Sequence, residues 1–108
     1  MNEFANTPKP PYYAVIFSST LKVNTKEYQE VSAQMEELAQ ENEGFLGYEA
    51  ARDGFGIFIS FWKDLDSIKK WKAESEHQIA QKRGRAEWYK RFKVRIAKVE
   101  RDYGFESE

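Results

Sequence analysis

The side chains best suited to the chemistry of a small active site lie between Trp62 and His77. His77 is the one histidine of the chain, and imidazole has an ordinary pKa near neutrality, which suits a general base. Trp71 and Trp62 offer flat surfaces on which a ring-shaped ligand can stack. We therefore predict a pocket with His77 as catalytic base at its mouth and Trp71 and Trp62 as its walls.

An uninterrupted helix would separate these side chains. Six residues turn a helix by about 600°, so Trp71 and His77 would point about 120° apart. They reach one cavity only if the helix breaks between Glu74 and Glu76. The alternative is that Trp71 belongs to the core and that His77 is a surface residue paired with Glu74 or Glu76.

Residues 82–95 form a basic segment with Trp88 and Tyr89 among its charges. We predict that Arg83 from this segment anchors an anionic part of a substrate. The other interpretations are a solvated face or a nucleic-acid patch. Because acidic helices balance the basic charge and the strands carry no RNA-stacking motif, we expect no nucleic-acid partner.

Composition excludes several classes of function. The chain has 17 basic and 18 acidic residues, so it has no overall attraction to nucleic acid or to anionic membranes. It has no cysteine, which excludes thiolate metal sites and a cysteine nucleophile, and we expect no metal. No phosphate-binding, dinucleotide or nucleophile-elbow motif occurs. Neither a signal peptide nor a membrane-spanning apolar run is recognisable, and we expect a cytoplasmic protein.

The elements that must position these residues follow from apolar periodicity. The pattern predicts strands at 12–20, 45–52, 56–63 and 89–101, and helices from Asn24 to a stop at Gly44 and over 64–84. Asp53-Gly54 predicts a hairpin turn. The β-α-β-β-α-β order predicts an α+β, ferredoxin-like fold with an antiparallel sheet.

The chain is long enough for one domain, which we place at residues 12–103. Residues 1–11 are polar and proline-rich and are expected to form a flexible N-terminal arm, and residues 104–108 an acidic tail. In the first helix the apolar stripe is Tyr28, Val31, Met35, Leu38 and Ala39, and the acidic face opposite is expected to be solvated.

Two of the predicted strands are apolar on both faces. In the first, Tyr13, Val15 and Phe17 alternate with Tyr12, Ala14 and Ile16. Two helices cover one face of a four-stranded sheet, and monomers rarely leave a large apolar patch exposed. We therefore predict a homodimer whose sheets pack into a dimeric α+β barrel. The alternative is that a broken second helix and the chain's tails cover the second face.

Three stretches carry a family resemblance: FISFWKDLDSIKKWKAESEHQIAQ, GFLGYEAAR and RAEWYKRFKVRIAKVERDY. Together they resemble the antibiotic biosynthesis monooxygenase superfamily over about residues 12–103. The resemblance implies cofactor-independent oxidation of a small aromatic or quinol-type molecule by O2, in which the substrate supplies the electrons. Trp71 matches the family's helix tryptophan and His77 the histidine that often follows it, while Trp62, Trp71 and Phe58 would line the cavity.

The same superfamily implies two alternatives. One is a haem-binding or haem-degrading protein, whose axial histidine would fall at Gln81 and whose first-strand asparagine would fall near Ser18 or Ser19. The chain departs from both positions, so we expect no cofactor, with haem bound through His77 as the alternative. The other is a dimeric module that binds a small hydrophobic molecule without catalysis.

Overall fold

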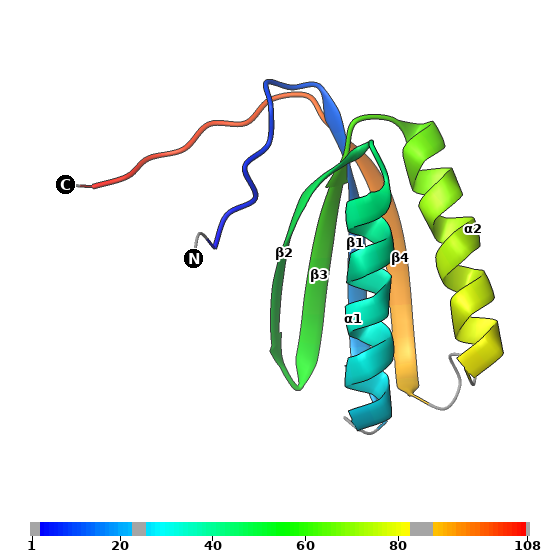
Figure 1. The fold of residues 1–108 in the computed structure, drawn as a ribbon. Helices are drawn as coiled ribbons and strands as arrows, with labels where there is room; N and C mark the ends of the chain where they lie inside the picture. Colours follow the sequence, from blue (N-terminus) through cyan, green and yellow to red (C-terminus); the bar gives the residue numbers. More distant parts are fainter. Residues whose placement is uncertain (1–2, 23–25, 83–87, 108) are drawn as a thin grey trace.

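The computed structural model describes residues 3–22, 26–82 and 88–107, apart from the side chains of Glu27 and of residues 77–82. These ranges form two helices and four strands in the order β-α-β-β-α-β (Figure 1). The bounds are β1 Tyr12–Leu21, α1 Lys26–Glu41, β2 Phe45–Asp53, β3 Phe55–Trp62, α2 Leu65–Lys82 and β4 Tyr89–Val99. The predicted ferredoxin-like α+β fold is confirmed.

All neighbouring strands are antiparallel, in the order β2-β3-β1-β4. Phe17 in the central strand β1 pairs with Phe58 of β3 and with Val94 of β4, and side chains directly opposite one another share a face. Phe92, Val94 and Ile96 therefore lie on one face of β4 and Lys93 and Arg95 on the other, as the alternation predicts.

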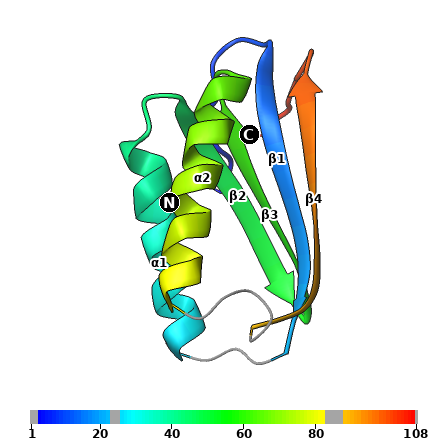
Figure 2. The ribbon, with the colours of Figure 1, turned by 90° about the vertical axis from the view of Figure 1, so that its right-hand side faces the viewer.

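Both helices lie on the same side of the sheet (Figure 2). Their apolar residues meet the sheet in a small core formed by Val15, Ala39, Trp62 and Ile68, against which Tyr13, Phe45 and Trp71 pack. Trp62 has 0% of its surface exposed, and its indole N–H donates to Ser60 Oγ at 2.8 Å. This core joins the C-terminal half of α1 to the N-terminal half of α2.

A second contact between the helices consists of hydrogen bonds. Asp64 caps α2, because its Oδ1 accepts a hydrogen bond from the Ser67 N–H at 2.8 Å. Hydrogen bonds from Ser67 hold the pKa of the Asp64 carboxyl below its ordinary value. After α1 ends, Asn42 Nδ2 donates to the Ser67 carbonyl at 3.2 Å and Asn42 Oδ1 accepts from the Gly44 N–H at 2.8 Å. The chain thus leaves α1 in contact with the first turn of α2.

A bulge at the start of β2 decides which residues of this strand face the helices. Phe45 pairs with Trp62, and Tyr48 pairs with Ser60, two residues earlier in β3. Phe45 and Tyr48 therefore share the helix-facing side although they are three positions apart, a spacing that puts two residues of a regular strand on opposite faces. Gly47, between them, has a φ of +134°, which glycine adopts readily.

The second face of the sheet is apolar and has no helix over it. Ile16, Ile59 and Phe61 are half-buried there, while Ile57 and Phe55 are 40% and 53% exposed. The alternating pattern predicted this apolar face. Within the described ranges, α2 runs to Lys82 without a break and stays on the opposite side, so it does not cover this face.

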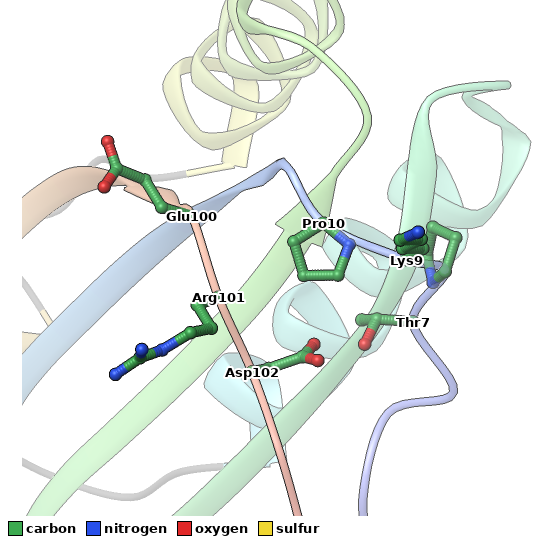
Figure 3. A pocket seen from close by; sticks show the side chains of 7 residues that line it. Thr7, Lys9, Pro10, Glu100, Arg101 and Asp102 are labelled. Carbon is green, nitrogen blue, oxygen red and sulfur yellow. The ribbon is translucent and has the colours of Figure 1, made fainter.

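The segment before β1 covers one end of that face. The Ala5 N–H donates to Glu49 Oε2 at 3.0 Å, and Thr7 Oγ1 donates to the Tyr12 hydroxyl at 3.1 Å. The Tyr12 hydroxyl in turn donates to Asp102, so residues before β1 and after β4 meet at this end. A shallow pocket of about 430 Å³ lies between them (Figure 3), lined by residues 7–10 and 100–102.

No helix in the described part of the chain has both the length and the apolar character needed to cross a bilayer.

The contact between Gly44 and Ser67 predicts the effect of a methyl group. In Gly44→Ala the new Cβ would lie 2.4 Å from Ser67 Cβ and 2.0 Å from its Oγ, and rotation of the hydroxyl relieves only the second clash. We expect a loss of roughly 1–3 kcal/mol in unfolding free energy, measured by denaturant titration. Gly104→Ala, which meets nothing within 4 Å, is the control. Equal stability of the two variants would contradict the close approach of the helices.

Candidate functional site

A cavity of about 810 Å³ lies between the helices and the helix-facing side of the sheet, and side chains from all six elements line it. Most of the lining is apolar or aromatic, and polar groups are few. Small-molecule sites typically have this composition and volumes of about 300–1,000 Å³. The cavity is therefore the candidate functional site.

Trp71 closes the cavity at the end where the core lies. Its ring centroid is 5.3 Å from that of Trp62, and its indole N–H donates to the Met35 carbonyl of α1 at 3.3 Å. The ring is thus held from two sides, by β3 and by α1. A side chain held in this way presents a fixed aromatic surface to the cavity.

A second aromatic cluster closes the opposite end. Tyr28 of α1 contacts Trp88 and Tyr89, with ring centroids 6.1 and 5.7 Å apart, and the Tyr89 hydroxyl donates to that of Tyr28 at 3.3 Å. Phe17 and Phe92 stack beside them with centroids 5.3 Å apart. Both ends of the cavity therefore offer aromatic edges or faces to a ligand.

The wall formed by β4 is the least covered. Phe92, Val94 and Ile96 line the cavity, yet 36%, 43% and 51% of their surfaces are exposed. They share the helix-facing side of the sheet, but the core residues of α1 and α2 lie over Val15 and Trp62 instead. The cavity is consequently open along β4.

One carboxylate lines the cavity. Glu36 of α1 is half-buried, and among the described lining residues it is the one acidic side chain. Burial raises the pKa of the Glu36 carboxyl, and a hydrogen bond donated by the Tyr48 hydroxyl offsets part of that rise. The Tyr48 ring stacks on Phe58 with centroids 5.0 Å apart and 12° between the planes. The Glu36 carboxylate therefore meets the hydroxyl edge of a stacked aromatic pair.

A guanidinium lies further along β2. Arg52 donates from Nη2 to Ser19 Oγ at 2.5 Å and from Nη1 to the carbonyls of Ser19 and Gly54, each at 3.3 Å. It lies against the backbone of Gly56, where an added Cβ would be 2.3 Å from the guanidinium carbon. Ser19 is 2% exposed, so its hydroxyl is a fixed acceptor. Arg52 is in this way oriented as a positive group on the cavity lining.

The structure brings some of the sequence-predicted residues to the cavity. Phe58 and Trp71 both line it. Trp62 lies behind Trp71, fully buried, and contributes no surface to the lining. Ser19, one of the two positions near which the resemblance places the haem branch's asparagine, accepts a hydrogen bond from Arg52.

His77 belongs to α2, which continues unbroken through Glu74 and Glu76, so the helix break that would turn His77 toward Trp71 is not found. The side chains of His77 and Gln81, and the whole of Arg83, lie outside the described residues. Their roles remain predictions.

Glu36, Tyr48 and Arg52 were not predicted from the sequence. The sequence predicts a solvated acidic face on this helix, yet Glu36 lies four residues after Ser32 and three before Ala39, both of which line the cavity. Helical spacing alone could therefore have identified it. Tyr48 and Arg52 depend on the bulge in β2, for which the one signal in the sequence is Gly47.

Among the described residues, no group of three or more His, Cys, Asp or Glu side chains is placed to hold a metal ion.

The architecture defines a ferredoxin-like domain with a cavity between its helices and its sheet, and comparison with known proteins identifies the family. Residues 11–83 match the family model described as antibiotic biosynthesis monooxygenase. The uncharacterized protein YqjZ of Bacillus subtilis (strain 168) is 45% identical over 108 residues, which cover 98% of this chain and 95% of that protein. The chain belongs to the antibiotic biosynthesis monooxygenase family.

Solved structures share the fold. A mutant of SnoaB, a cofactor-independent oxygenase from Streptomyces nogalater, superposes with a TM-score of 0.68 at 14% identity, over 84% of this chain and 95% of that one. PA3566 from Pseudomonas aeruginosa gives a TM-score of 0.58 at 16% identity, over 89% of this chain and 99% of that one. At these identities the likeness is one of fold.

The position of Glu36 predicts a pH-dependent cost in stability. Because its pKa is raised in the folded protein, the folded state binds the proton more tightly than the unfolded state. Stability should therefore fall as pH rises from the ordinary glutamate pKa through the raised one. Glu36→Gln lacks this penalty, so we expect its Tm to exceed that of the wild type at neutral pH and the difference to shrink in acid. A Tm difference independent of pH would contradict the burial of the carboxylate.

Proposed function

We propose that this protein is a small-molecule monooxygenase that oxidises a phenol- or quinol-type aromatic compound with O2 and without a bound cofactor. The observation that carries the proposal is the cavity, which is aromatic at both ends and has a carboxylate and a guanidinium among its few polar groups. Family membership and the fold shared with a cofactor-independent oxygenase support the same class of activity.

Such a reaction asks three things of the protein. The substrate's own anion is the reductant of O2, so the protein must bind the ring, accept a proton and exclude water. Trp71 and Phe58 supply aromatic surfaces for the ring. Arg52 supplies a positive charge that favours the anion. His77 as base and Arg83 as anion anchor are the further roles proposed from the sequence.

Filling the cavity tests this proposal. Ala50→Trp would place an indole in the cavity lining, whereas Ala33→Trp would add the same group on an exposed part of α1 that does not line it. With 1,4-dihydroxynaphthalene and O2 uptake measured above the protein-free rate, we expect Ala50→Trp to lower kcat/KM at least about tenfold, because a displaced substrate loses its reactive geometry. Ala33→Trp should keep wild-type activity.

Two other outcomes would favour the alternatives. Saturable binding of naphthols without O2 uptake from any quinol would point to a binding module that performs no catalysis. A Soret shift on adding haemin, abolished in His77→Ala, would point to haem. Equal losses of kcat/KM in Ala50→Trp and Ala33→Trp would show that the cavity is not the site of the reaction.

We also propose that two copies of the chain pair through the open face of the sheet. The centre of this face is apolar, with Ile16, Ile57 and Ile59. Its two edges carry opposite charges, basic on β4 and acidic on β2, in the side chains of Arg91, Lys93, Arg95, Glu49 and Asp53. A second copy would bury the apolar centre and match the two edges.

The strand register indicates how the two copies would be oriented. Asp53 on β2 and Arg91 on β4 lie in the same cross-strand row, which passes through Phe55 and Thr20. A two-fold axis parallel to the strands sets the β4 edge of one copy over the β2 edge of the other. Each cross-strand row of one copy then faces the same row of the second copy. Asp53 would then face Arg91 of the second copy, whereas an axis perpendicular to the strands would oppose like charges.

Charge reversal tests this arrangement. We expect Arg91→Asp or Asp53→Arg alone to weaken the dimer roughly fivefold, the equivalent of about 1 kcal/mol, and the double variant to recover most of the loss. Sedimentation over a concentration series measures it. A wild-type chain that stays monomeric at high concentration, or a double variant weaker than either single one, would contradict the proposal.

A further inference from the structure

Glu36 occupies an unusual position on α1. The helix turns Tyr28, Val31, Ser32, Met35 and Ala39 toward the cavity, and Glu36 belongs to this stripe rather than to the solvated side of the helix. An ionised carboxylate next to apolar surface loses hydration, which is a cost to stability. Residues kept in spite of such a cost are frequently functional.

The surroundings of Glu36 fit proton acceptance. Its carboxylate accepts a hydrogen bond from Tyr48, whose ring is fixed by stacking on Phe58. A carboxylate accepts several hydrogen bonds, so the bond from Tyr48 leaves capacity for a donor on a ligand. A flat molecule stacked on an outer face of the Tyr48–Phe58 pair would bring a hydroxyl at its edge alongside the Tyr48 hydroxyl, and so toward Glu36.

We propose that Glu36, in place of His77, is the proton acceptor of this cavity and that it acts on the ring hydroxyl of a flat phenol or quinol. Tyr48 is a positioning residue, which orients the carboxylate through its hydroxyl. The proposal rests on the function proposed above and names the group that starts the reaction.

The proposed reaction needs only the protein, the substrate and dissolved O2. The O–H bond of the ring hydroxyl breaks, its proton passes to a Glu36 carboxylate oxygen, and the electron pair stays on the substrate. The anion then reduces dissolved O2. For 1,4-dihydroxynaphthalene, one oxygen atom enters the ring to give a hydroxynaphthoquinone and the other leaves as water.

The pH dependence of this step follows the pKa of Glu36, which the ionisable groups around it can shift. The described ionisable side chains that share the cavity with it are Tyr28, Tyr48 and Arg52, together with Lys72 and Tyr89, whereas the Lys93 side chain points to the opposite face of the sheet. Of these, only Tyr48 acts on the pKa of Glu36, and it lowers it. Removing the Tyr48 hydroxyl should therefore raise that pKa further.

Binding of 2-naphthol, which has one hydroxyl and does not need O2 to bind, tests Glu36 without catalysis. Between the pKa of Glu36 and that of the naphthol, the carboxylate accepts a hydrogen bond from the ligand. We expect affinity to rise about tenfold as pH passes through the pKa of Glu36, measured by tryptophan fluorescence. The rise should vanish in Glu36→Gln and remain in Glu37→Gln, a variant of the exposed neighbouring glutamate.

Oxidation of 1,4-dihydroxynaphthalene tests the same residue during turnover. We expect Glu36→Gln to lower kcat about a hundredfold, to raise KM by no more than about tenfold, and to abolish the acidic limb of the pH profile. Tyr48→Phe should move that limb to higher pH, which a merely structural role for Tyr48 would not do. Glu37→Gln should match the wild type.

The outcomes separate this proposal from the proposed function. Naphthol binding that depends on Glu36 and pH, without O2 uptake, would keep Glu36 as hydrogen-bond acceptor and remove the oxidation. Naphthol binding that is independent of pH or absent in the wild type would overturn the proposal. So would an acidic limb that survives in Glu36→Gln and disappears in His77→Gln.

Discussion

Trp62 has none of its surface exposed, and it packs between Trp71 and Phe45 at one end of the sheet. This contact holds the end of α1 and the beginning of α2 against β1 and β3, and the capped turn at Asp64 keeps the two helices together there. The apolar residues of β4 are left without a helix over them. A cavity therefore results from anchoring both helices at one end of a sheet that is wider than they can cover.

The charged groups of that cavity are complementary to each other. Glu36 and Arg52 are opposite in charge, each is held by a neighbouring hydroxyl, and each meets the cavity from a different element. A phenol needs an acceptor for its proton, and its anion needs a nearby positive charge. Burial of the Glu36 carboxylate lowers the stability of the folded state. Functional residues often lower stability in this way.

Much of this architecture was predictable. Alternating and helical apolar spacing gave the element order and both faces of β1 and β4, because these patterns follow directly from backbone geometry. The lining of β2 was not predictable by alternation, since the bulge at Gly47 moves Tyr48 and Arg52 to the helix side. The charge of Glu36 favours an exposed position, so the one sign of its place in the cavity is its helical spacing from Ser32 and Ala39.

The proposed function requires that a flat aromatic molecule binds in the cavity between the helices and the sheet. Nuclear magnetic resonance of the indole N–H groups tests it directly, since the chain has three tryptophans and two of them, Trp71 and Trp88, line the cavity. In an anaerobic titration with 1,4-dihydroxynaphthalene, we expect saturable shifts of the Trp71 and Trp88 signals. Unchanged indole signals, with shifts confined to Ile16 and Ile59 on the open face, would contradict it.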